Sequence, residues 1–173
     1  MTQSSNDIIQ NSSPLLYDKI AQELNDEMNC LGYIDDLYPV CSIGEEEDQT
    51  YPEVYQNDGT KVNLRVMPDS TKSLSFFIVE GDLQEIDEDD LIIPMAYVVW
   101  MNLTKVDPAR KYDYTEEVIR KVYNVIKDYG GYDISVNINS PLEGFTMLEG
   151  NTVNMRPYSA FKVSFNKNMR VCL

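Results

Sequence analysis

The sequence has no histidine among its 173 residues, and this absence removes the side chain on which general acid–base catalysis most often depends. Catalytic arrangements of the Ser-His-Asp and Cys-His kinds are therefore impossible. The chain also has no G-x-x-x-x-G-K-S/T loop, no G-x-G-x-x-G loop and no G-x-S-x-G motif. These absences give no support to nucleotide chemistry, and we expect neither an enzyme nor a cofactor.

Cysteine is scarce and shows no pairing pattern. Cys30, Cys41 and Cys172 cannot all pair within the chain and have no C-x-x-C spacing, which indicates either a reducing compartment or simply buried thiols that pack as small hydrophobic residues. Residues 1–12 have no basic and apolar segments of a signal peptide. The longest uncharged stretch, Leu91 to Leu103, is too short to span a bilayer as a helix. We therefore predict a protein made in the cytoplasm without a membrane partner.

Basic residues are also few. The chain has 14 Lys and Arg against 29 Asp and Glu, for a formal charge of −15. Nucleic acids and anionic membranes bind proteins largely through Lys and Arg, so this balance predicts no specific nucleic-acid binding. Hydrophobic residues make up 43%, and a chain of this length can bury about 70% of its unfolded surface in one core. We predict a flexible N-terminal arm over residues 1–12 and a single domain over residues 13–173.

Two helices are expected from apolar residues repeating every three or four positions. The first runs from Pro14 to Leu31, with Ser13 as its N-cap and Gly32 as its stop. The second runs from Glu116 to Tyr129 with Thr115 as its cap. The predicted buried stripe of this second helix consists of Val118, Val122, Val125, Ile126 and Tyr129.

Strands are predicted from alternation and from turn residues. A hairpin joins 51–56 to 61–67 through Asn57-Asp58-Gly59, and the uncharged run Ala96 to Leu103 predicts the central strand, covered on both faces. The other predicted strands are 38–43, 74–80, 132–139 and 160–165. The order is α-β-β-β-β-β-α-β-β, which predicts an α+β fold with one mainly antiparallel sheet packed with two helices. A long connection, 140–157, has Phe145, Met147 and Leu148 as candidate anchors.

Acidic residues gather in two segments that we predict to be loops, 44–48 and 80–90. Neither segment has the ligand offsets and the glycine that an EF-hand calcium loop requires, so we predict no metal site. Carboxylates in loops are usually solvated surface groups, and none can be singled out as catalytic.

The element order, with Tyr38-Pro39 and Tyr51-Pro52 soon after the first helix and the Tyr-Val-Val-Trp-Met strand (97–101) before the second, resembles the tail-completion or tail-terminator proteins of tailed bacteriophages. That family has an amphipathic first helix, an antiparallel sheet, an inserted second helix and a closing strand resembling 161–165. The resemblance spans about residues 13–165. It implies a structural virion protein of the phage neck or tail that forms an oligomeric ring at the head–tail junction.

Such a ring would contact neighbouring connector or tail proteins, and DNA would pass through it. Carboxylates that line a lumen repel phosphates over about 8 Å at physiological salt, which suits a passage that must not bind DNA. The candidate lumen or interface residues are Glu45, Glu46, Glu47, Asp82, Glu85, Asp87, Glu88, Asp89 and Asp90. The alternative is an acidic DNA mimic that inhibits a nucleic-acid enzyme, which would need carboxylates at phosphate-like spacing.

Overall fold

The structure is a computed structural model that describes residues 23–24, 26–29, 31–38, 40–55, 60–64, 73–87, 90–145 and 157–170. The predicted arm over residues 1–12, the turn at 57–59, Cys30, Cys172, Glu88 and Asp89 lie outside these residues, as do Met147 and Leu148. In the described part of the chain, no helix is long and apolar enough to cross a membrane.

The larger of two sheets has the strand order β1-β5-β7-β9-β8, and β6 also pairs with β7. Its strands are β1 (Asp36–Tyr38), β5 (Ser73–Val79), β6 (Gln84–Asp87), β7 (Asp90–Asn102), β8 (Gly131–Asn137) and β9 (Tyr158–Arg170). Only β1 and β5 are parallel, and the other pairs in this sheet are antiparallel. The α+β fold class with a mainly antiparallel sheet is therefore confirmed.

The prediction of a single sheet is wrong, because a second sheet has the order β2-β3-β4. Its strands are β2 (Val40–Glu46), β3 (Gln49–Tyr55) and β4 (Lys61–Asn63). The predicted strand 38–43 is thus divided between β1 and β2, which belong to different sheets. The residue between them in the sequence is Pro39, which has no backbone N–H to donate to a ladder. The predicted hairpin of β3 and β4 is confirmed, with Tyr55 opposite Lys61.

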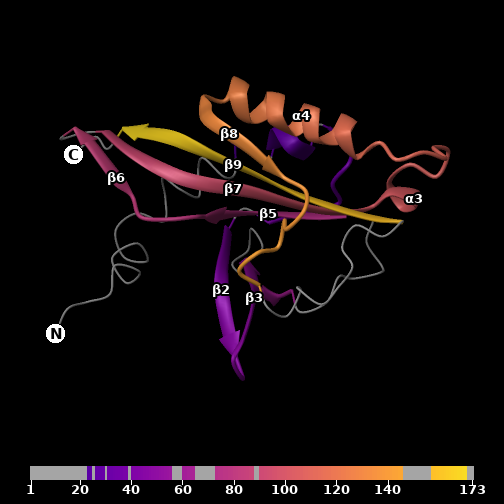
Figure 1. The fold of residues 1–173 in the computed structure, drawn as a ribbon, viewed down its shortest axis with the longest axis horizontal. Coiled ribbons are helices and arrows are strands. Elements are labelled where there is room, and N and C mark those ends of the chain that lie inside the picture. Colours follow the sequence, from indigo (N-terminus) through magenta and orange to yellow (C-terminus); the bar gives the residue numbers. More distant parts are fainter. Residues whose placement is uncertain are drawn as a thin grey trace.

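Strand β7 lies in the middle of the larger sheet, as predicted, and its side chains enter two separate cores. Met95, Tyr97 and Val99 belong to a core shared with helix α4 (Thr115–Asp128), whereas Val98 and Trp100 belong to a core shared with β2 and β3. Figure 1 shows α4 on one face of the sheet and the β2–β3 hairpin projecting from the other. A continuous apolar run is what a strand buried on both faces requires.

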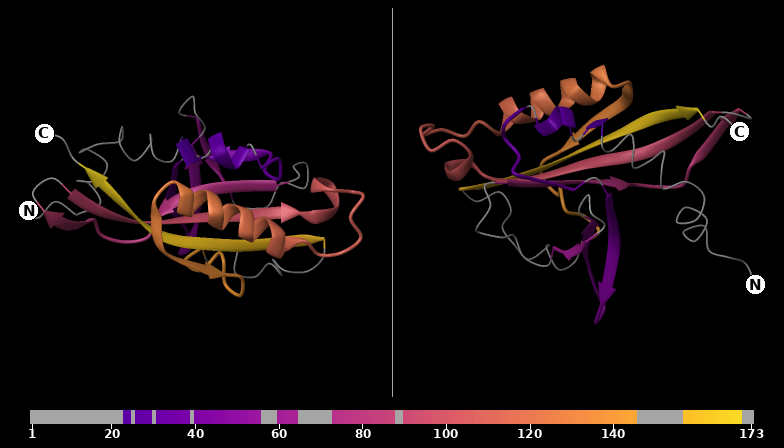
Figure 2. Two further views of the ribbon diagram at one scale, coloured as in Figure 1. Left: turned by 90° about the horizontal axis from the view of Figure 1, so that it is seen from above. Right: turned by 180° about the vertical axis from the view of Figure 1, so that it is seen from behind.

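Helix α4 presents the predicted stripe to the sheet: Val118, Val122 and Ile126 are fully buried. Val125 and Tyr129 are partly buried against the same core, and so the stripe is confirmed. Figure 2 shows from above that α4 lies over the sheet near β7 and β9. Residues 23–24 and 26–29 are helical, which agrees with the predicted first helix over that part, and Leu24 and Met28 are buried in the core of α4.

The predicted cap of α4 is wrong. Thr115 is the first helical residue, and Tyr114 occupies the cap position without a side-chain cap hydrogen bond. The Thr115 backbone N–H and hydroxyl both donate to Asp113 Oδ1, at 2.8 and 2.6 Å, so the residue two positions earlier accepts these hydrogen bonds. A short helix before it, α3 (Leu103–Val106), was not predicted.

The predicted acidic loop 80–90 is also wrong in part, because residues 84–87 form β6 and β7 begins at Asp90. Strand β6 pairs with β7 through Gln84 opposite Ile92 and Glu85 opposite Leu91. Residues 84–86 are exposed, so this strand has no buried face and its sequence shows no alternation.

The connection after β8 carries buried Leu142 and Phe145 against the second core, and Phe145 is therefore confirmed as an anchor.

Candidate functional site

The most distinctive surface feature is the tip of the β2–β3 hairpin, which we call the acidic tip: Glu45, Glu46, Glu47 and Asp48. The four side chains are exposed. Glu46 lies opposite Gln49, so Glu47 and Asp48 form a two-residue turn at the end of the hairpin. Figure 1 shows this end to be the part of β2 that lies farthest from the larger sheet. The prediction that 44–48 is a loop is therefore wrong in part, because residues 44–46 pair as the end of β2 and only Glu47 and Asp48 form the turn.

The turn has an unusual backbone for its sequence. Glu47 and Asp48 have φ angles of 49° and 64°, in the left-handed region that a two-residue hairpin turn of the I′ type requires at both positions. Asn, Asp and Gly are preferred there, because a left-handed conformation costs other residues such as Glu47 roughly 1–2 kcal/mol. Strain of this kind is found at functional sites, where selection retains a costly residue for another reason. We take the acidic tip as the candidate functional site on this ground.

The hairpin is held in place by an ion pair and by hydrogen bonds from its own strands and from the connection after β8. Glu53 lies on β3 with Lys61 Nζ 2.6 Å from its Oε2, and the Tyr55 hydroxyl donates to its Oε1 at 2.8 Å. Burial acts to raise the pKa of Glu53, but the hydrogen bonds from Lys61 and Tyr55 outweigh it and hold that pKa below its ordinary value. The Thr50 hydroxyl donates to the Gly144 carbonyl at 2.8 Å, which ties the hairpin to the connection after β8.

The second group of candidate residues lies elsewhere. Asp82 precedes β6, Glu85 and Asp87 are on β6, and Asp90 begins β7. Asp90 Oδ1 lies 4.0 Å from Arg170 Nε, so one member of this group has a basic neighbour. Figures 1 and 2 place β6 at one end of the larger sheet, well away from the end of β2. The structure therefore does not bring the two groups of candidates together.

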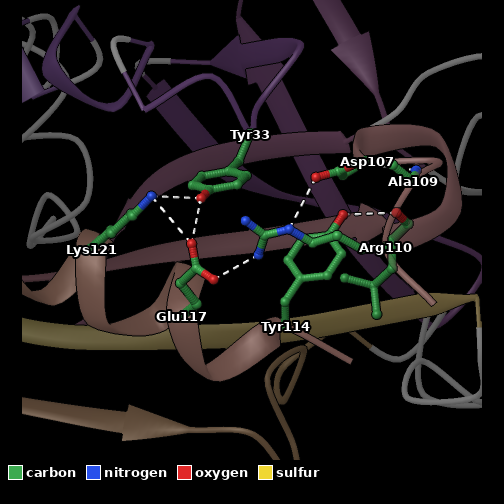
Figure 3. A network of polar contacts seen from close by, with 8 residues as sticks. Tyr33, Asp107, Ala109, Arg110, Tyr114, Glu117 and Lys121 are labelled. Carbon is green, nitrogen blue, oxygen red and sulfur yellow. Dashed lines mark hydrogen bonds and ion pairs between the residues drawn. The ribbon is translucent and has the colours of Figure 1, made fainter. Parts of the chain in front are cut away.

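A network of charged and aromatic side chains, which the sequence did not reveal, joins α4 to two other segments (Figure 3). Arg110 Nη1 lies 2.6 Å from Glu117 Oε2, and the Tyr33 hydroxyl donates to Glu117 Oε1 at 3.0 Å. Lys121 Nζ donates to the Tyr33 hydroxyl at 2.6 Å, and Arg110 Nε lies 3.0 Å from Asp107 Oδ2. The hydrogen bond from Arg110, together with that from Tyr33, lowers the pKa of Glu117 to about 2.

This network is structural in character. Both oxygens of Glu117 accept hydrogen bonds from side chains of the same protein, and a carboxylate held ionised in this way is a poor proton acceptor at neutral pH. The one signal in the sequence was the spacing of Glu117 and Lys121, whose Oε1 and Nζ lie 3.4 Å apart. Tyr33 lies 84 positions before Glu117, and no local pattern could have joined them.

No family model, curated protein or solved structure matches this chain. Among the residues that the structure describes, no three or more Cys, Asp or Glu side chains are grouped so that they could hold a metal ion.

Proposed function

We propose that this protein is a structural virion protein of the neck or tail of a tailed bacteriophage, and that copies of it form a ring at the head–tail junction through which DNA passes. The observation that carries the proposal is the acidic tip, which presents four exposed carboxylates on a strained turn at the end of a projecting hairpin. Its function does not require chemistry, because repulsion of DNA needs only fixed negative charge.

The hairpin suits the lining of a channel because its position is fixed. Cys41 and Val54 hold its base in the second core, and buried Tyr51 lies opposite Gly44 nearer the tip, so the four charges cannot fold back onto the body without moving these side chains. Charges held on a rigid arm repel phosphates over about 8 Å at physiological salt. A ring of such arms would keep DNA centred without binding it.

The alternative, an acidic DNA mimic, has less support. Mimicry of a duplex requires carboxylates in a continuous array, whereas the acidic tip and the β6 group lie on separate parts of the molecule (Figure 1). Competition between this protein and duplex DNA for a basic nucleic-acid enzyme would test the alternative directly.

Electron microscopy of the purified protein, with its mass measured by light scattering, tests the proposal. We expect annular particles, alone or when the phage connector is added. The triple variant Glu45→Gln, Glu46→Gln, Glu47→Gln should form the same particles and retain more duplex DNA at low salt. A matched control that also removes three exposed carboxylates, Glu116→Gln with Asp128→Asn and Glu143→Gln, should leave DNA retention unchanged. A protein that stays monomeric at high concentration and does not join a connector would contradict the proposal.

A further inference from the structure

The exposed apolar side chains of this protein gather at the edges of the larger sheet. Leu83, which precedes β6, is 38% exposed, and Ile86 on β6 is 54% exposed. Val136 on β8 is 41% exposed, and Ile138, just after β8, is 49% exposed. The other large apolar side chains that are exposed in the described residues are Ile43 and Tyr112.

Strands β6 and β8 lie on opposite edges of the larger sheet. Strand β9 pairs with β7 along its whole length, from Asp90 to Asn102, so β5 and β6 must lie on the other side of β7. Strand β8 lies beyond β9 and ends the sheet on its own side. Among the described strands, neither β6 nor β8 has a partner on its outer side.

The two edges differ in charge, and this difference disfavours the pairing of two copies through their β6 edges. Asp82, Glu85 and Asp87 lie on or just before β6, so pairing two copies through β6 would place like charges opposite each other. Strand β8 carries one charged residue, Asp133, which lies at a bulge with a φ of 51°. Natural proteins protect exposed edges with charges, Pro or bulges, and after the bulge at Asp133 the rest of β8, Ile134 to Asn137, carries no charge.

The directions of β6 and β8 also allow these two edges to pair between copies. Strand β8 runs antiparallel to β9, which runs antiparallel to β7, whereas β6 is antiparallel to β7. Hence β6 and β8 run in opposite directions within one subunit. A second copy placed beside the first in the same orientation would set its β6 antiparallel to β8.

We propose that β8 of one copy pairs in antiparallel fashion with β6 of the next, so that the larger sheet continues from subunit to subunit. This contact is heterologous, since each copy uses a different edge on each side, and such contacts close into rings when the rotation permits. Directly opposed residues of paired strands share a face, so Glu85 (opposite Leu91) and Val136 (opposite Val163) both lie on the face of the sheet that α4 covers, and the contact brings them to the same face of the continued sheet. The inference rests on the proposed ring and identifies the surface through which it forms.

Disulfide cross-linking tests this pairing. The double variant Glu85→Cys with Val136→Cys, whose positions share one face of the sheet, is made with Cys30 and Cys172 changed to Ser, while Cys41 stays because its thiol is buried. Under mild oxidation we expect a ladder of covalent dimers, trimers and larger species. Each single-cysteine variant should stay at the monomer position on a denaturing gel. No ladder from the double variant, or equally strong dimers from Val136→Cys alone, would overturn the proposal.

A second measurement separates the pairing from the ring itself. Val136→Glu places a negative charge opposite the acidic β6 edge of the next copy and should lower the mass of the assembly at least twofold by light scattering. The matched control Asn124→Glu, at an exposed position of α4, should leave that mass unchanged. If annular particles form but give no ladder, the β6–β8 contact is wrong and the proposed ring is unaffected. If wild-type protein forms no annular particles, either alone or with the connector, the proposed ring is wrong as well.

Discussion

Gly44 lies directly opposite Tyr51 across the β2–β3 hairpin, and a Cβ added at Gly44 would lie 2.5 Å from Tyr51 Cε2. The ring of Tyr51 is buried, so it cannot move out into solvent to make room. An aromatic side chain over a glycine on the neighbouring strand is a stable arrangement that pins the register of a hairpin.

We predict that Gly44→Ala destabilises the protein by about 1–3 kcal/mol, because the added methyl overpacks a buried contact. Urea unfolding followed by tyrosine and tryptophan fluorescence measures this change. The control is Gly81→Ala, where the added Cβ would meet Pro94 Cγ at an ordinary 3.4 Å. Equal stability of the two variants would show that Tyr51 can shift without cost.

The strained turn of the acidic tip gives a prediction of the opposite sign. Replacing Glu47 and Asp48 with Asn and Gly supplies the residues that a type I′ turn prefers, and we expect a gain in the free energy of unfolding of about 1–2 kcal/mol. The control Glu45→Gln with Glu46→Gln removes the same charge but leaves the turn unchanged. It should alter stability by no more than about 0.5 kcal/mol. If both double variants stabilise the protein equally, then charge repulsion and not backbone strain is the cause.

The sequence predicted elements whose signal is local and strong. The uncharged run 96–103 placed the centre of the sheet, and the spacing of Val118, Val122 and Ile126 placed the buried face of α4. These predictions succeeded because burial on two faces or on one helical stripe leaves a continuous mark on the residues themselves.

Features that depend on distant partners could not be predicted. Residues 84–87 form a strand because β7 extends far enough to pair with them, although their own sequence is polar and exposed. The division of 38–43 between two sheets depends on two different pairing partners, β5 for β1 in the larger sheet and β3 for β2 in the smaller one. Sequence reading did find the acidic segment 44–48 but not its turn, since Glu47-Asp48 is not a pair that hairpin turns prefer.

A buried hydrogen bond in the main core gives a third prediction. The Tyr97 hydroxyl donates to Ser75 Oγ at 2.8 Å, and both residues are fully buried. Ser75→Ala leaves the Tyr97 hydroxyl without this acceptor, and we expect a loss of about 1–3 kcal/mol. The double variant Ser75→Ala with Tyr97→Phe removes both polar groups and should recover part of that loss. If the losses in the free energy of unfolding from Ser75→Ala and from Tyr97→Phe simply add in the double variant, the hydrogen bond contributes nothing.

Glu117 gives a prediction about acid. Its ordinary pKa is 4.5, and the hydrogen bonds from Arg110, Tyr33 and Lys121 lower the pKa in the folded protein to about 2. Because the folded pKa lies below the unfolded one, the stability that Glu117 contributes is complete above about pH 4.5 and is lost as pH falls toward 2. Glu117→Gln should therefore lower the unfolding midpoint at pH 6, and its difference from wild type should shrink steadily below pH 4.5.

Urea midpoints of wild type and Glu117→Gln, measured from pH 6 to pH 2 at constant salt, provide the comparison. Glu116→Gln is the matched control, because it removes a neighbouring carboxylate that lies exposed in the same helical turn and outside the network of Figure 3. Its difference from wild type should stay small over the whole range. A difference between wild type and Glu117→Gln that does not change from pH 6 to pH 2 would show that the Glu117 charge does not stabilise the fold. In that case the connection between α4 and Tyr33 would depend on packing of the Tyr33 ring alone.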